Sequence, residues 1–272
     1  MYLGKLLCFM AVCGVCCSAN FALAAIQYDQ SVTTNAIWGS GNSNGGFTTD
    51  RNSSVGIELG LRAHVRYPVP NDSIPNGIKS NGDGTYGSFD PTGYTSGGAT
   101  GGTRASWNMD WSINSNYNGA GANLNDFTYT LELDFDPGVG TNYQSAYGSS
   151  DPVNGPLWAD HSFGNNSTAQ GAGVEAPFPN TVTYSSLIGS SNLVQNSSNL
   201  DFEDTILYPF DPTADGIYSF RLSAYRGGDL LAQSSIDVIV GDGVVPEPAT
   251  ILVWTGIATC AGLAYLRKQR SA

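Results

Sequence analysis

The 272-residue sequence predicts an all-β protein, a β-sandwich or a jelly roll, for three reasons. Several stretches alternate apolar and polar residues with a period of two, which is the pattern of a half-buried strand. Threonine and aromatic residues, which favour strands, are frequent, as are glycine and asparagine, which favour turns. Between positions 25 and 245, no window of ten or more residues repeats apolar side chains with the 3.6-residue period of a helix.

The first 24 residues have the pattern of a secretory signal peptide. Lys5 supplies a positive charge, Leu6–Cys17 form an apolar run, and Ala22-Leu23-Ala24 matches the small-x-small cleavage pattern. We therefore expect export by the Sec machinery and cleavage by signal peptidase between Ala24 and Ala25.

The exported segment, residues 25–245, is acidic and lacks cysteine. It contains 22 acidic and 7 basic residues, a net charge of −15. This excess of acidic residues argues against nucleic-acid binding, because the segment has no stripe of basic residues that could bind phosphate groups. All five cysteines lie outside the segment, so it has no disulfide, thiol nucleophile or cysteine metal site. Its 221 residues are enough to bury a core without such links.

Two alternating series predict strands in the first half of this segment. Apolar residues occupy every second position from Val55 to Val65, before Pro68, and the next series is Trp107, Met109, Trp111 and Ile113. Between the two series, residues 79–102 contain eight glycines and few apolar residues, which predicts a long loop or a disordered insertion.

Two further series predict strands in the second half. Odd positions from Phe127 to Phe135 should point inward, up to the break at Pro137. Even positions of residues 218–224 and 232–240 should also point inward, as two strands joined by the turn Arg226-Gly227-Gly228-Asp229. Residues 215–241 resemble a late strand pair of immunoglobulin-like and PKD-like sandwiches, in which Tyr218 would be a tyrosine corner.

Three carboxylates alternate with the apolar series at 127–135. Glu132, Asp134 and Asp136 should share one face of the strand at intervals of about 6–7 Å. Such oxygens could bind Ca²⁺, although no EF-hand spacing accompanies them. The alternative is an exposed face of solvated carboxylates without any metal or other cofactor.

Other candidate residues lie in regions that resemble loops. Asp160-His161-Ser162 contains the residue types of a hydrolytic triad, but consecutive residues rarely converge, so we interpret His161 as an ordinary loop histidine. Aromatic residues in loops could stack on sugars or could simply pack the loops against the sandwich. These are Tyr86, Phe89, Tyr94, Tyr143, Tyr147 and Trp158.

The C-terminal end carries the most specific pattern. Pro246-Glu247-Pro248 precedes an uncharged apolar stretch at 249–266, which is just long enough to span a membrane as a helix. Arg267, Lys268 and Arg270 would hold its end in the cytoplasm.

Together, residues 246–270 resemble the PEP-CTERM sorting signal of bacterial envelope proteins. The resemblance implies that an exosortase-type membrane protease recognises the signal and removes the helix. The protein would then be anchored transiently in the inner membrane before it reaches the cell surface or the extracellular space.

These features together predict a non-enzymatic protein of the cell surface or extracellular matrix, with a structural or adhesive role in the envelope or exopolysaccharide. The alternatives are a carbohydrate- or calcium-binding sandwich with the same sorting and, less favoured, a secreted hydrolase.

The terminal motifs predict two processing events in the host. The mature protein should begin at Ala25 and should lack the chain that follows the Pro246-Glu247-Pro248 region. Intact-mass analysis of the surface-exposed protein measures both ends. A final product that still contains residues 254–270 would contradict sorting and would instead indicate a plain tail anchor.

Overall fold

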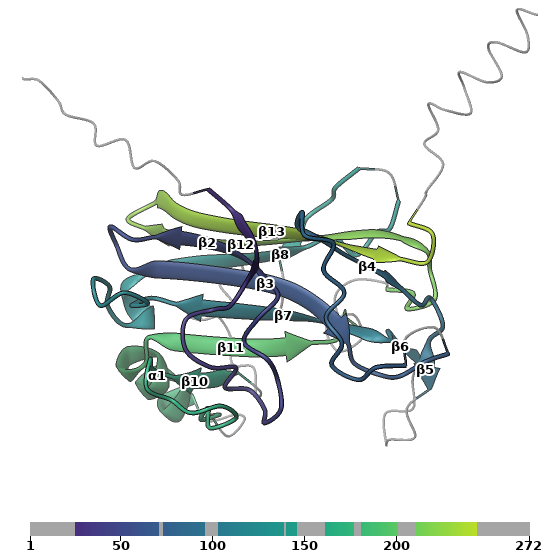
Figure 1. The fold of residues 1–272 in the computed structure, drawn as a ribbon. Coiled ribbons are helices and arrows are strands. Elements are labelled where there is room, and N and C mark those ends of the chain that lie inside the picture. Colours follow the sequence, from purple (N-terminus) through teal and green to yellow (C-terminus); the bar gives the residue numbers. More distant parts are fainter. Residues whose placement is uncertain are drawn as a thin grey trace, which may run out of the picture.

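Two β-sheets pack face to face in the computed structural model, which describes residues 25–70, 73–95, 103–138, 140–145, 161–176, 181–200 and 210–243 (Figure 1). The larger sheet is antiparallel and has the order β1-β2-β3-β7-β11-β10. Its strands are β1 (Gln27–Gln30), β2 (Phe47–Asn52), β3 (Ile57–Val65), β7 (Trp107–Asn114), β11 (Leu193–Ser198) and β10 (Ser162–Gly164).

The smaller sheet has the order β4-β13-β12-β8-β9, in which only the β4–β13 pair is parallel. Its strands are β4 (Thr85–Phe89), β13 (Asp229–Val240), β12 (Gly216–Arg226), β8 (Thr128–Leu133) and β9 (Gln144–Ser145). Three short elements complete the described chain: the ribbon of β5 (Tyr94–Thr95) and β6 (Thr103–Arg104), a 3₁₀ turn η1 (Leu124–Asp126), and helix α1 (Thr181–Ser190). The all-β prediction is confirmed.

One hydrophobic core fills the space between the sheets, and it contains the side chains that the alternation placed inward. The odd positions of 57–65, 107–113 and 127–135 are buried, as are the even positions of 218–224 and 232–240. Trp107 lies at the centre, with its ring 5.8 Å from Phe89, 5.9 Å from Tyr218 and 6.0 Å from Phe220. The predicted inward faces of these strands are therefore correct.

The last hairpin also forms as predicted. Gly227 and Gly228 have φ values of +62° and +93°, which the two-residue turn between β12 and β13 requires and which glycine adopts without strain. At the start of β12, the hydroxyl of Tyr218 donates to the carbonyl oxygens of Asp211 (3.5 Å) and Ala214 (3.3 Å). A tyrosine corner would make such a contact with the upstream backbone, but the resemblance to immunoglobulin-like sandwiches stays a prediction.

The expectation of a long loop at 79–102 is wrong in part. Strand β4 lies within this segment and pairs with β13, while Tyr86 and Phe89 are fully buried in the core. Alternation did not reveal the strand because Tyr86 and Phe89 lie three residues apart, across an irregularity in the register that includes Gly87. A Cβ atom there would lie 2.3 Å from the carbonyl oxygen of Ile239, so glycine allows the close backbone approach that an apolar residue would prevent. Residues 96–102 lie outside the described part of the chain.

Helix α1 was not expected either. It buries Tyr184 and Ile188, which lie four residues apart on one face, with Leu187 partly buried beside them. A stripe of three residues in a ten-residue helix is too short to produce a recognisable period, so tertiary packing decides the structure of this segment.

Both faces of the central strands of the larger sheet are buried, although the alternation predicted a polar, exposed outer face. Every residue of β3 and of β7 is buried. The loop between β1 and β2, residues 31–46, crosses the outer face of β3, β7 and β11 and shields it from solvent (Figure 1). This covered polar face contains the candidate functional site.

No helix in the described ranges is long and apolar enough to cross a membrane. The signal peptide at 1–24, the sorting motif Pro246-Glu247-Pro248 and the apolar stretch at 249–266 lie outside those ranges, so these interpretations remain predictions.

The register of β8 can be tested with two aspartate substitutions on one strand. Leu133→Asp should lower the free energy of unfolding by several kcal/mol, because Leu133 is fully buried and an ionised carboxylate would have no partner there. Thr128→Asp should cost less than about 1 kcal/mol, since Thr128 is exposed on the opposite face. Urea unfolding measures both, and equal losses would contradict the register.

Candidate functional site

The outer face of the larger sheet is a buried layer of polar side chains. They project from neighbouring strands that are in register, so that Arg62 of β3 and Ser197 of β11 both lie opposite Asp110 of β7. Gln195 and Ser112 form the next pair along β11 and β7. Strand alternation places polar side chains on this face, and the loop at 31–46 then buries them.

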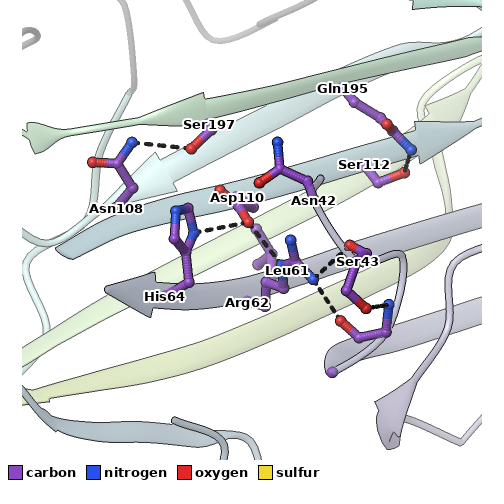
Figure 2. Close-up of polar contacts among 12 residues, drawn as sticks. Asn42, Ser43, Leu61, Arg62, His64, Asn108, Asp110, Ser112, Gln195 and Ser197 are labelled. Atoms are coloured by element: carbon purple, nitrogen blue, oxygen red, sulfur yellow. Dashed lines mark hydrogen bonds and ion pairs between the residues drawn. The ribbon is translucent and has the colours of Figure 1, made fainter. Parts of the chain in front are cut away.

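Gln195 joins this loop to the sheet. Its Oε1 accepts a hydrogen bond from the backbone N–H of Ile37 at 2.7 Å, while its Nε2 donates to the carbonyl of Asn35 at 3.2 Å and to the hydroxyl of Ser112 at 3.1 Å. The Gln195–Ser112 contact is visible in Figure 2. One amide therefore satisfies both the loop backbone and the strand beneath it.

The strongest interaction in this layer is the ion pair between Arg62 and Asp110. The Nε of Arg62 lies 2.7 Å from Oδ2 of Asp110, and both side chains are excluded from solvent (Figure 2). Nη1 of Arg62 donates to the carbonyl oxygens of Ser43 (2.9 Å) and Gly45 (2.6 Å) in the loop. The guanidinium also lies over the ring of Phe47, 4.3 Å from its centroid. Arg62 thus connects the sheet to the loop at 31–46 that covers it.

His64 extends the pair toward the end of β3. Its Nδ1 lies 3.0 Å from Oδ2 of Asp110, the oxygen that also faces Arg62 (Figure 2). Burial alone would raise the pKa of Asp110, but the charges of His64 and Arg62, together with hydrogen bonds from His64 and Ser197, outweigh it and lower the pKa to about 2. Asp110 is therefore ionised at neutral pH.

Beside this cluster lies a groove with a volume of about 590 Å³. One wall is the loop at 31–46, which contributes Trp38 and Asn42, and the floor includes His64 and Asn108. Asn108 donates a hydrogen bond from Nδ2 to the hydroxyl of Ser197 at 3.0 Å, so the floor is itself held in place. The groove is open to solvent, mainly polar, and contains an aromatic ring at its edge.

The opposite wall is formed where the β5–β6 ribbon meets the end of β3. The rings of Tyr67 and Tyr94 stack in parallel, with centroids 4.4 Å apart and an interplanar angle of 4°. Arg104, which pairs with Tyr94 across the ribbon, donates from Nη1 to the hydroxyl of Tyr67 at 3.4 Å. Tyr67, Arg104 and the exposed Arg66 line the groove on this side, together with Glu175.

A second, smaller hollow of about 350 Å³ involves the other sheet. It is lined by Tyr28, Tyr143 and the carboxylates Asp83 and Asp237, and none of its described lining residues is basic. The larger groove is the better candidate site because it combines a bigger volume with aromatic, amide and charged groups.

The three carboxylates predicted as a calcium site have separate roles. Glu132 forms an ion pair with Nε of Arg221 at 2.8 Å. Asp134 is buried rather than exposed, because its two oxygens accept the backbone N–H groups of Asp136 and Asn142, each at 3.0 Å. In the described ranges, no three His, Cys, Asp or Glu side chains gather where they could hold a metal ion. The prediction that all three carboxylates share an exposed face is wrong, whereas calcium binding remains an untested prediction.

Three of the six aromatic residues predicted in loops lie away from the groove. Tyr86 and Phe89 belong to the core, and the ring of Tyr143 lies 4.2 Å from the guanidinium of Arg221. Tyr94 alone reaches the groove region, through Tyr67. Tyr147 and Trp158 lie outside the described residues.

His161 lies just before β10, outside any strand, but it is buried and not an exposed loop histidine. It is buried with its ring 5.0 Å from that of Trp111. Asp160 lies outside the described residues.

Sequence reasoning missed the residues that form the groove, including Trp38, Arg66 and Arg104. Their positions are far apart in the chain, and none belongs to a motif. The available signal was compositional. Basic residues are scarce in 25–245, and two of them, Arg66 and Arg104, lie at the ends of strands.

Comparison with known protein families, characterised proteins and solved structures gives no match. The molecule is thus defined by its all-β fold and by this groove.

The buried ion pair can be tested through its pH dependence. Since folding lowers the pKa of Asp110, its contribution is present at pH above about 4 and is lost as the pH falls toward 2. Asp110→Asn should lower the free energy of unfolding at pH 7 by about 3–5 kcal/mol, because Arg62 remains buried without a counter-charge. The variant should also lose less stability than the wild type between pH 4 and pH 2.

Urea unfolding over a pH series measures both effects. Asp229→Asn, which changes an exposed carboxylate at the hairpin turn, is the control and should leave stability nearly unchanged. Wild-type stability of Asp110→Asn at pH 7 would rule out the structural role of the pair.

Proposed function

We propose that this protein is an exported component of the cell surface or extracellular matrix, and that its β-sandwich binds polysaccharide in the groove of the larger sheet. The observation that carries the proposal is the groove itself, which is lined by Trp38 and Tyr67 together with asparagine amides and serine hydroxyls. Sugars present an apolar ring face and a rim of hydroxyls, so they need both kinds of partner at once.

The dimensions and the construction of the groove support this role. Its volume of about 590 Å³ is in the range of ligand sites, and its open shape would let a chain continue beyond the occupied sugars. The ion pair of Arg62 with Asp110 and the bonds of Gln195 hold its wall before any ligand arrives. A wall that is already ordered reduces the entropy lost on binding.

A binding role is better supported than hydrolysis. Glycoside hydrolysis uses two carboxyl groups that flank the scissile bond, whereas Glu175 is the one carboxylate among the described lining residues. We therefore propose an adhesive or structural, non-enzymatic protein. The order of Pro246-Glu247-Pro248, apolar stretch and basic end supports sorting by an exosortase-type protease, with Sec export and signal peptidase at the other end.

A glycan array probed with the full chain in mild detergent tests the proposal. We expect binding to at least one polysaccharide both with Ca²⁺ and with EDTA, and no shortening of the bound chain. Tyr67→Ala should weaken this binding at least about tenfold, because an aromatic contact at the centre of a site often contributes more than 1.4 kcal/mol.

Tyr28→Ala is the matched control, since it removes an exposed ring from the hollow on the other side of the molecule. Thermal melts of both variants check that they fold. Equal weakening by the two variants, or no binding to any glycan, would contradict the proposed site. Release of shorter sugars would instead identify the protein as an enzyme.

A further inference from the structure

The distribution of basic residues on this acidic domain is uneven. Only seven occur in residues 25–245, which have a net charge of −15. Two of the seven, Arg66 and Arg104, line the groove, and a third, Arg62, lies beside it in the buried layer. The described lining of the groove thus contains more basic than acidic residues, whereas the domain as a whole is strongly acidic.

Arg66 is available to a ligand. It is exposed at the end of β3, and it forms no ion pair with any carboxylate in the described part of the chain. Its guanidinium lies over the neighbouring ring of Tyr67, 5.6 Å from the centroid. Arg104 is held on the same wall through its bond to the hydroxyl of Tyr67. Tyr67 therefore contacts both guanidinium groups, that of Arg66 through its ring and that of Arg104 through its hydroxyl.

The described residues that line the groove include two arginines and one carboxylate. Asp110 lies beneath the floor, where its ion pair with Arg62 already neutralises it. Glu175 is the single carboxylate among the described residues that line the groove. The hollow on the other sheet has the opposite character, since Asp83 and Asp237 line it without a basic residue in the described ranges. These two hollows thus differ in the charged residues of their described lining.

We infer that the groove selects an anionic polysaccharide, a chain whose sugars carry carboxylate or sulfate groups. The inference rests on the proposed function and specifies its ligand. Guanidinium groups form paired, charge-assisted hydrogen bonds with such oxyanions, and these bonds are stronger and more directional than those to a neutral hydroxyl. The tyrosines and amides of the groove would then contact the sugar rings between the charged groups.

The net charge of the domain does not oppose this selection at short range. Mobile ions screen charges over about 8 Å at physiological ionic strength, so the carboxylates elsewhere on the surface have little effect inside the groove. They do oppose non-specific adsorption of a polyanion to the rest of the domain. Binding of a polyanion would therefore have to occur at a locally positive site.

Two matched pairs of probes test the inference with the full chain in mild detergent and EDTA. The first pair is polygalacturonate and its methyl-esterified, neutral form, and the second is dextran sulfate and dextran. We expect the anionic member of at least one pair to bind about tenfold or more tightly. A preference in the first pair alone identifies carboxylate as the recognised group, and a preference in the second alone identifies sulfate. A preference in both pairs means that any oxyanion is accepted.

Equal binding within both pairs would overturn the inference and leave polysaccharide binding intact, as would binding only to neutral glycans on the array. No binding to these probes or to any glycan would remove the proposed function itself. EDTA excludes a bridge in which Ca²⁺ joins the acidic protein to the acidic sugar, so such bridging cannot imitate the expected result.

Substitution of the arginines locates the preference. Arg66→Gln should reduce the preference for the anionic probe several-fold, and Arg66→Gln with Arg104→Gln should abolish it. Thermal melts should show that Arg66→Gln folds like the wild type, since this side chain is exposed. Arg226→Gln, at the exposed hairpin turn, is the control and should keep the wild-type preference. A preference that survives the double substitution, or that Arg226→Gln reduces equally, would overturn the assignment.

Discussion

The organisation of the larger sheet depends on the burial of Arg62 with Asp110. An arginine and an aspartate that face outward from neighbouring strands would ordinarily remain in water, where their attraction contributes little. Here the loop at 31–46 closes over them, and its carbonyl groups accept the remaining donors of Arg62. Because an unpaired charge at this depth would be costly, each partner requires the other and both require the loop. The position of the loop in turn creates one wall of the groove.

This arrangement explains how far the sequence could predict the structure. Alternation identified the inward faces of β3, β7, β8, β12 and β13, because each has a regular series of apolar side chains. The same alternation predicted a solvent-exposed outer face for β7, since Asp110 and the other even positions of the strand are polar. Polarity alone does not distinguish an exposed carboxylate from one that is buried with its partners. That distinction depends on a loop from a distant part of the chain, as the burial of Asp134 by the backbone of Asn142 also illustrates.

The candidate site was less predictable than the fold for a related reason. Its walls come from the loop at 31–46, the end of β3 and the β5–β6 ribbon, which lie apart in the sequence and share no motif. The glycine-rich segment 79–102 was interpreted as a loop, yet it contains β4 and also β5, the strand that carries Tyr94. In this segment, glycine is compatible with close backbone packing as well as with a flexible loop. Only the tertiary structure distinguishes these two uses of glycine.

The central proposal is that the groove beside the loop at 31–46, on the outer side of the larger sheet, is the ligand-binding site. The most direct test is amide hydrogen exchange of the full chain, measured with and without saturating polygalacturonate in EDTA. The account predicts slower exchange in residues 31–46 and 65–67, which border the groove, and unchanged exchange at the hairpin turn 226–229. Protection confined to the smaller sheet, or no protection under conditions where binding is measured independently, would contradict it.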